Sequence, residues 1–130
     1  MNNNPTSTID RAIAVSENAA EQGFDWNTAI DVLDKIVEEI AEIRQALRLN
    51  EPKERIAEEC GDLFFALVNF NRKMQIDSEN AFSAGIDKFE RRFQKLVSLV
   101  DQTGHKISDL NLDVLESLWT IVKKEEKNGE

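Results

Sequence analysis

Two residue types that build many catalytic and structural sites are almost absent from this sequence of 130 residues. The one cysteine, Cys60, excludes an internal disulfide. The one histidine, His105, stands in a Gly-His-Lys turn, which removes histidine-rich zinc sites and Ser-His-Asp triads from consideration. Any chemistry in this chain must therefore be sought in other side chains.

Positive charge is also in short supply. Sixteen lysines and arginines stand against 25 aspartates and glutamates, and the formal net charge is −9. This balance argues against a nucleic-acid-binding surface, which would show a basic patch, and against adsorption to anionic membranes. It does not exclude a nucleotide ligand, because a metal ion can screen the phosphates locally.

Long apolar runs are missing as well. The longest covers residues 63–68, far short of the roughly 20 residues that span a bilayer. Residues 1–5 are polar and do not resemble a signal peptide. We therefore expect a cytoplasmic protein.

The hydrophobic pattern predicts an all-α protein, because strand-like alternation is never sustained. We expect four main helices over residues 28–49, 53–74, 79–102 and 112–126, plus a short N-terminal helix over 9–22. Residues 1–7 are expected to be a disordered tail. A chain of this length forms one domain, or one that completes its core with a copy of itself. We expect a helical bundle completed by dimerisation.

Apolar stripes predict which helix faces point inward. Asn27 is a plausible N-cap of the helix over 28–49. That helix should bury a stripe made of Leu33, Ile36, Val37, Ile40, Ile43 and Leu47. The helix over 79–102 should bury Phe82, Ile86, Phe89, Phe93, Leu96 and Val100, which alternate at spacings of four and three.

Two pairs of acidic residues carry the main functional signal. Glu39 pairs with Glu42, and Glu59 with Asp62, each three residues apart and so on one helix face. Both pairs lie on or beside apolar stripes. Two carboxylates about 4 Å apart repel by roughly 4 kcal/mol at an effective dielectric constant near 20. Such acids must bind protons or hold a cation, and their oxygens suit Mg²⁺ or Mn²⁺. The alternative is that these acids are simply solvated.

A pair of basic residues on the helix over 79–102 is a candidate phosphate clamp. Lys88 and Arg92 are one turn apart and flank the apolar seam. The alternative, which the pattern alone favours, is that they pair with Glu90 or Asp87 in solvent. On the helix over 53–74, Asn69 follows the acidic face and its amide is a candidate for the same pocket.

The last helix offers an aromatic residue beside an ammonium group. Trp119 and Lys123 are one turn apart and could contact a base or a phosphate. A tryptophan at a helix-packing position is more often part of the core.

The combination Glu38-Glu39-x-x-Glu42 and Glu59-x-x-Asp62 resembles the signature of the all-α nucleoside triphosphate pyrophosphohydrolases. The resemblance is closest to the MazG family, and within it to the second of two tandem domains. It covers about residues 20–126 and implies a single pyrophosphohydrolase domain over 8–127. Further similar stretches are residues 23–26, 58–69, 88–93 and 118–123.

This resemblance implies roles for the acidic residues. Glu39, Glu42, Glu59 and Asp62 match Mg²⁺ ligands, and Mn²⁺ is an alternative ion. Glu38 or Glu39 would take a proton from the attacking water. Members of the family are usually dimers that cleave nucleoside triphosphates to a nucleoside monophosphate and pyrophosphate.

The resemblance also assigns substrate contacts. Lys88 and Arg92 match a phosphate-contacting pair, and Trp119 and Lys123 a nucleotide-contacting pair; Asn69 is our own candidate beside them. Two alternatives stay open at this stage. One is an enzyme with narrow specificity, similar to a dUTPase or dCTPase, and the other is a helical dimerisation module without catalysis.

Overall fold

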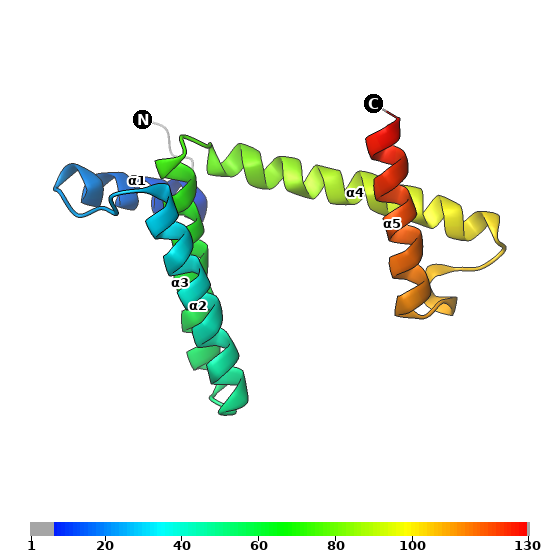
Figure 1. Cartoon of the computed structure of the whole chain (residues 1–130), viewed down its shortest axis with the longest axis horizontal. Helices are drawn as coiled ribbons and strands as arrows, with labels where there is room; N and C mark the ends of the chain where they lie inside the picture. The colour runs from blue at the N-terminus through cyan, green and yellow to red at the C-terminus, as the bar shows by residue number, and fades with distance from the viewer. Residues whose placement is uncertain (1–6, 130) are drawn as a thin grey trace. The chain divides into compact units, whose positions relative to one another are not determined.

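The computed structural model describes residues 7–129 and is entirely helical over that range (Figure 1). The predicted all-α class is therefore confirmed. The helices are α1 (Thr8–Glu21), α2 (Ala29–Arg48), α3 (Lys53–Lys73), α4 (Ser78–Gln102), the 3₁₀ helix η1 (Ile107–Asp109) and α5 (Leu112–Asn128). Of the predicted tail, only Ser7 is described, and it caps α1; the rest lies outside the described residues. Between residues 7 and 129, no helix is long and apolar enough to cross a membrane.

The helix ends follow local side-chain chemistry. Gly23 terminates α1 in a left-handed conformation with φ of +97°, where glycine carries no steric penalty. The predicted cap of α2, Asn27, is wrong. Thr28 takes that place, since its hydroxyl accepts from the Asp31 amide while the Asp31 carboxylate accepts from the Thr28 amide. This reciprocal capping box satisfies two backbone donors at once, which a single asparagine side chain does not do.

The chain divides into two compact units, one ending at Ala81 and the other beginning at Phe82. In the first unit, α2 and α3 form a helical hairpin, and α1 packs against α3 (Figure 1). The buried residues of α2 are spaced seven apart, which is the period of a close helix–helix seam. They are Val32, Glu39 and Ala46 on α2, facing a buried set of Glu59, Ala66 and Asn69 on α3.

The predicted inner stripe of α2 is wrong for four of its six residues, whereas Ile36 and Ile43 are partly buried. Leu33, Val37, Ile40 and Leu47 are exposed, and Val37 reaches 66%. On α3, Phe64 is 71% exposed. The buried residues of α2, at positions 32, 39 and 46, each precede by one residue a member of the predicted apolar stripe, at positions 33, 40 and 47. The face of α2 that packs on α3 is therefore turned by one residue from the predicted one. This apolar face of the hairpin is therefore left uncovered by the other described helices of the first unit.

The second unit is built from α4 from Phe82 onward, η1 and α5. Its core is the cluster of Leu96, Val100 and Val122, with Trp119 among the partly buried residues packed on it. Only this end of the predicted α4 seam is buried. The prediction is wrong for Phe82, Ile86, Phe89 and Phe93, which are exposed.

Candidate metal centre

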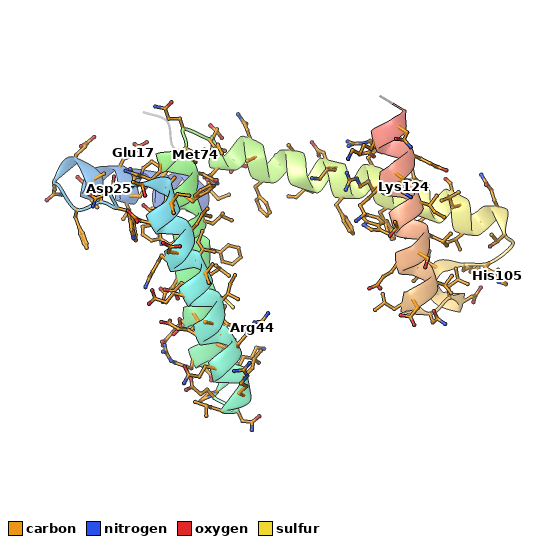
Figure 2. All side chains as sticks on the ribbon, viewed as in Figure 1. Glu17, Asp25, Arg44, Met74, His105 and Lys124 are labelled. Atoms are coloured by element: carbon orange, nitrogen blue, oxygen red, sulfur yellow. The ribbon has the colours of Figure 1, made fainter. Side chains whose placement is uncertain are left out.

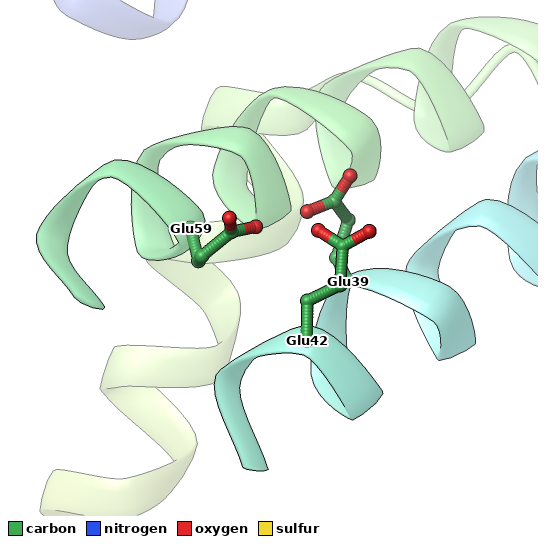
Figure 3. Close-up of side chains that lie close together, drawn as sticks. All are labelled: Glu39, Glu42 and Glu59. Atoms are coloured by element: carbon green, nitrogen blue, oxygen red, sulfur yellow. The ribbon is translucent and has the colours of Figure 1, made fainter. Parts of the chain in front are cut away.

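Three carboxylates converge between α2 and α3. One oxygen each from Glu39, Glu42 and Glu59 lies within 4.8 Å of the other two. Figure 3 shows Glu39 and Glu42 pointing from successive turns of α2 toward Glu59, which reaches across from α3. Such a spacing lets a single cation contact all three residues.

Two of these carboxylates occupy positions that ordinarily hold apolar residues. Glu39 is the middle member of the seam Val32–Glu39–Ala46 and is only 3% exposed, while Glu59 is 2% exposed. The small side chains of Ala46 and Ala66 in the same interface permit close approach of the helices. Burial of charge at such positions costs free energy unless partners compensate it.

Two basic side chains provide part of that compensation. Lys35 Nζ lies 3.1 Å from Glu39 Oε1, and Arg55 Nη2 lies 2.7 Å from Glu59 Oε1. Each base precedes its glutamate by four residues, one helical turn. Our sequence analysis missed both residues, although the spacing of four is visible in the sequence.

The second oxygen of each buried glutamate is left without a partner among the described residues. Glu39 Oε2 and Glu59 Oε2 are buried and accept no hydrogen bond. Unsatisfied buried acceptors are rare and costly in folded proteins. The compensation by Lys35 and Arg55 is therefore incomplete, and each carboxylate has a free oxygen for a further ligand.

The protonation equilibria reflect this crowding. A hydrogen bond with Glu42 that favours the acid form, together with burial and the nearby Glu39, raises the pKa of Glu59 to about 7, although Arg55 opposes the change. Burial also acts to raise the pKa of Glu39, but the Lys35 ammonium outweighs it and the net pKa is lowered. Near neutral pH the cluster can therefore hold a shared proton, and a cation could take the place of that proton.

These observations fit a hard divalent cation. The donors are carboxylate oxygens that converge from two helices, and each of the two buried glutamates has one oxygen without a hydrogen-bond partner among the described residues. Mg²⁺ and Mn²⁺ prefer such ligands, and sulfur or imidazole donors are not part of this group.

A cavity of about 280 Å³ adjoins the carboxylates in the first unit. It gives the metal centre an open side, large enough for part of a small ligand. Its lining combines aromatic, basic and acidic side chains: Trp26, Lys35, Glu39, Asp62, Phe65 and Ala66.

Asp25 anchors the segment that carries Trp26 into this cavity. It lies in the turn between α1 and α2 (Figure 2). Its Oδ2 accepts from Arg72 Nη1 at 3.2 Å and from Lys73 Nζ at 3.3 Å. Lys73 also donates to the Trp26 carbonyl oxygen at 2.8 Å. Sequence analysis missed this anchor, since nothing local links residues nearly fifty positions apart.

The structure brings together three of the four predicted metal ligands. Asp62 is exposed and lines the adjoining cavity rather than joining the cluster of three. Glu38 is exposed on the neighbouring turn, with Lys35 Nζ 3.4 Å from its Oε1. Asn69 is buried, and its amide is already engaged, donating to the Phe65 carbonyl and accepting from Arg72.

Four of the five predicted substrate contacts belong to the second unit, and the fifth, Asn69, belongs to the first. Lys88 and Lys123 are exposed on α4 and α5. Arg92 donates from Nε to Glu126 at 3.2 Å, rather than to Glu90 or Asp87. Trp119 packs on the core cluster, and its ring lies 5.5 Å from that of Phe89.

Comparison with known proteins adds a family relationship. Residues 16–97 match the model of the MazG nucleotide pyrophosphohydrolase domain. The chain is 35% identical over 115 residues to the nucleoside triphosphate pyrophosphohydrolase/pyrophosphatase MazG of Thermotoga maritima, an alignment that covers 88% of this chain. It is 36% identical over 117 residues to the nucleoside triphosphate pyrophosphohydrolase of Escherichia coli, covering 89% of this chain. In both cases the alignment spans 44% of the relative's length.

Proposed function

This chain belongs to the MazG nucleotide pyrophosphohydrolase family, and from that premise we propose that it hydrolyses nucleoside triphosphates. The reaction would cleave the bond between the α- and β-phosphates, depend on Mg²⁺, and release a nucleoside monophosphate and pyrophosphate. Mn²⁺ is an alternative ion. The observation that carries the proposal is the convergence of Glu39, Glu42 and Glu59 with two unpartnered buried oxygens.

The acidic residues would have two roles at the metal, namely binding the ion and accepting a proton. Glu39, Glu42 and Glu59 would hold the ion, with Asp62 reaching it from the adjoining cavity. When bound, the ion would polarise the α-phosphate and lower the pKa of a water molecule. Glu38 is exposed beside the cluster, so either it or Glu39 can accept the proton of the attacking water.

Basic and aromatic residues would bind the substrate. A triphosphate carries about four negative charges into an acidic region, so its departing pyrophosphate needs positive partners. We assign that role to Lys88 and Arg92. Trp119 and Lys123 would contact the rest of the nucleotide. Asn69 would act indirectly, because its amide oxygen accepts from Arg72, which also donates to Asp25.

We also propose that two copies of this chain associate. The uncovered stripe of α2, formed by Leu33, Val37, Ile40 and Leu47, is the reason. Phe64 adds a further exposed apolar side chain on α3. Contiguous apolar surface of this kind marks protein–protein contact, and a homodimer would bury it. Sedimentation equilibrium tests this directly: a monomer at all concentrations would contradict it.

The experiment that tests the activity measures pyrophosphate released from a mixed pool of nucleoside triphosphates, with Mg²⁺ and with EDTA. We expect metal-dependent pyrophosphate and an equal amount of monophosphate. Release of orthophosphate would mean that a different bond is cut and would refute the mechanism.

A matched pair of variants ties the activity to the carboxylates. Glu59→Gln removes a buried ligand of the cluster and should abolish turnover. Glu54→Gln makes the same charge change at an exposed position in the first turn of α3 and should leave turnover unchanged. Retained activity in Glu59→Gln would refute the assignment.

A further inference from the structure

Three basic side chains of α4 converge on one carboxylate of α5. Glu126 accepts from Arg91 through Nε at 3.3 Å and Nη2 at 3.0 Å. It also accepts from Arg92 Nε at 3.2 Å and from Lys95 Nζ at 3.4 Å. The Glu126 side chain is 12% exposed, so this carboxylate is enclosed by the cations. Their hydrogen bonds lower the pKa of Glu126 to about 2, with Arg91 contributing most, and the group is ionised near neutral pH.

The three basic side chains contact the Glu126 carboxylate with different geometries. Arg91 presents a two-pronged contact to it, whereas Arg92 touches it only from the side, through Nε. Between residues 7 and 129, neither Nη nitrogen of Arg92 donates a hydrogen bond to protein. The two Nη groups form the flat end of a guanidinium, which matches two oxygens of a phosphate group.

The local charge balance favours an anionic ligand at that end. Arg92 and Lys95 alone bring two positive charges to the one negative charge of Glu126, in a chain whose net charge is −9. The Arg92 side chain is 23% exposed, so part of it is accessible to a ligand from solvent. Hydrogen bonds to Glu126 hold these positive charges in defined positions, unlike charges on a freely solvated helix face.

We infer that Glu126 is a positioning residue. Its carboxylate holds the Arg92 guanidinium at the Nε edge, so that the Nη end faces a phosphate of the substrate. This inference rests on the proposed function for the assignment of Arg92. A side-on carboxylate restricts rotation about the last bonds of the arginine side chain. Less conformational freedom is then lost when a phosphate binds, which raises affinity.

A competing view makes Glu126 a simple link between α4 and α5. Such a link would affect the stability of the unit but not its affinity for phosphates. A second view makes Glu126 an internal competitor of the phosphate, in which case its removal would tighten binding. The three views therefore predict different results for one substitution.

The test measures binding of pyrophosphate, in the presence of Mg²⁺, by isothermal titration calorimetry. Glu126→Gln keeps the side-chain shape but removes the charge, and we expect it to weaken binding roughly fivefold to tenfold, in line with loss of preorganisation. Glu125→Gln is the matched control, because it makes the same charge change at the adjacent, exposed position. It should leave the affinity within about twofold, since a single exposed charge is largely screened.

The dependence on Arg92 is tested in the Arg92→Gln background. There, Glu126→Gln should cause no further weakening, because the residue through which it acts is gone. The inference is overturned if Glu126→Gln leaves affinity unchanged or tightens it, or if its effect persists without Arg92. Unfolding of each variant followed by circular dichroism separates these effects from loss of fold.

The proposed function can fail independently of this inference. If the unaltered protein binds pyrophosphate with the expected pattern but hydrolyses no nucleoside triphosphate, the reaction is refuted and the role of Glu126 stands. If the unaltered protein hydrolyses triphosphates but Glu126→Gln matches it in pyrophosphate affinity, the positioning role is refuted alone. If it binds no pyrophosphate, the positioning role is refuted as well.

Discussion

Replacing Asp25 by Asn should destabilise the first unit by an amount that depends on pH. Asp25 joins the turn before α2 to the end of α3, through Arg72 and Lys73. Asparagine keeps the shape and one acceptor but removes the charge that both bases need. The Arg72 guanidinium, whose buried Nε already lacks a partner among the described residues, would lose its counter-ion.

The magnitude follows from the pKa of Asp25. The hydrogen bond from Arg72, followed by that from Lys73, lowers this pKa from 3.8 to about 2 against the effect of burial. A change of this size corresponds to about 2 kcal/mol in favour of the charged, folded form. The Asp25 side chain is 22% exposed, and solvent screening reduces the contribution to about 1–2 kcal/mol.

The sign of the pH dependence is set by the direction of that change. Because the pKa is lower in the folded protein, the contribution is complete well above 3.8 and is lost as the pH falls through about 2. The difference between Asp25→Asn and the unaltered protein should thus be greatest near pH 7. At pH 3 it should be roughly half as large.

Urea denaturation followed by circular dichroism at both pH values measures this difference. Asp34→Asn is the control, since Asp34 is exposed on α2 and makes no side-chain hydrogen bond within residues 7–129. It should change the free energy of unfolding by less than about 0.5 kcal/mol. A cost for Asp25→Asn below that value at pH 7, or an equal cost at pH 7 and pH 3, would refute the reasoning.

Two further predictions concern the metal centre and the second core. Mg²⁺ at 100 times its dissociation constant should stabilise the unaltered protein by about 2.7 kcal/mol in thermal unfolding. Glu59→Gln should lose this response, and an undiminished response would count against the site. Val122→Ala removes a fully buried side chain from the core of the second unit and should cost about 2 kcal/mol by loss of apolar contact and creation of a cavity. Thr120→Ala, an exposed change two residues away, should cost far less in the same urea titration.

Most of the helical architecture could be predicted because helix formation is governed by local signals. The ends of α2, α3, α4 and α5 lie within two residues of the predicted ones. Gly23 marks the end of α1 and Pro52 the start of α3. Both act through their own backbone geometry, which does not depend on tertiary contacts. The prediction of Asn27 as the cap failed because Thr28 is also a good cap, and only the reach to Asp31 distinguishes the two residues.

The acidic cluster could be predicted in outline for a similar reason. A spacing of three places Glu39 and Glu42 on one face of any helix, whatever that helix packs against. The pattern on α3 suggested Glu59 and Asp62 as an equivalent pair. The structure places Glu59 in the cluster and Asp62 in the cavity beside it.

The sequence by itself determined the helices, the acidic spacing and the resemblance to the family, since each depends on residues that are near one another in the chain. Only the tertiary structure decided which face of α2 meets α3, because an apolar stripe is wide enough to allow rotation by one residue. That rotation buries Glu39 instead of Ile40. It leaves two carboxylate oxygens without partners and exposes an apolar stripe. The long-range pairings of Asp25 with Arg72 and of Arg92 with Glu126 were likewise decided by packing, because no local rule connects them.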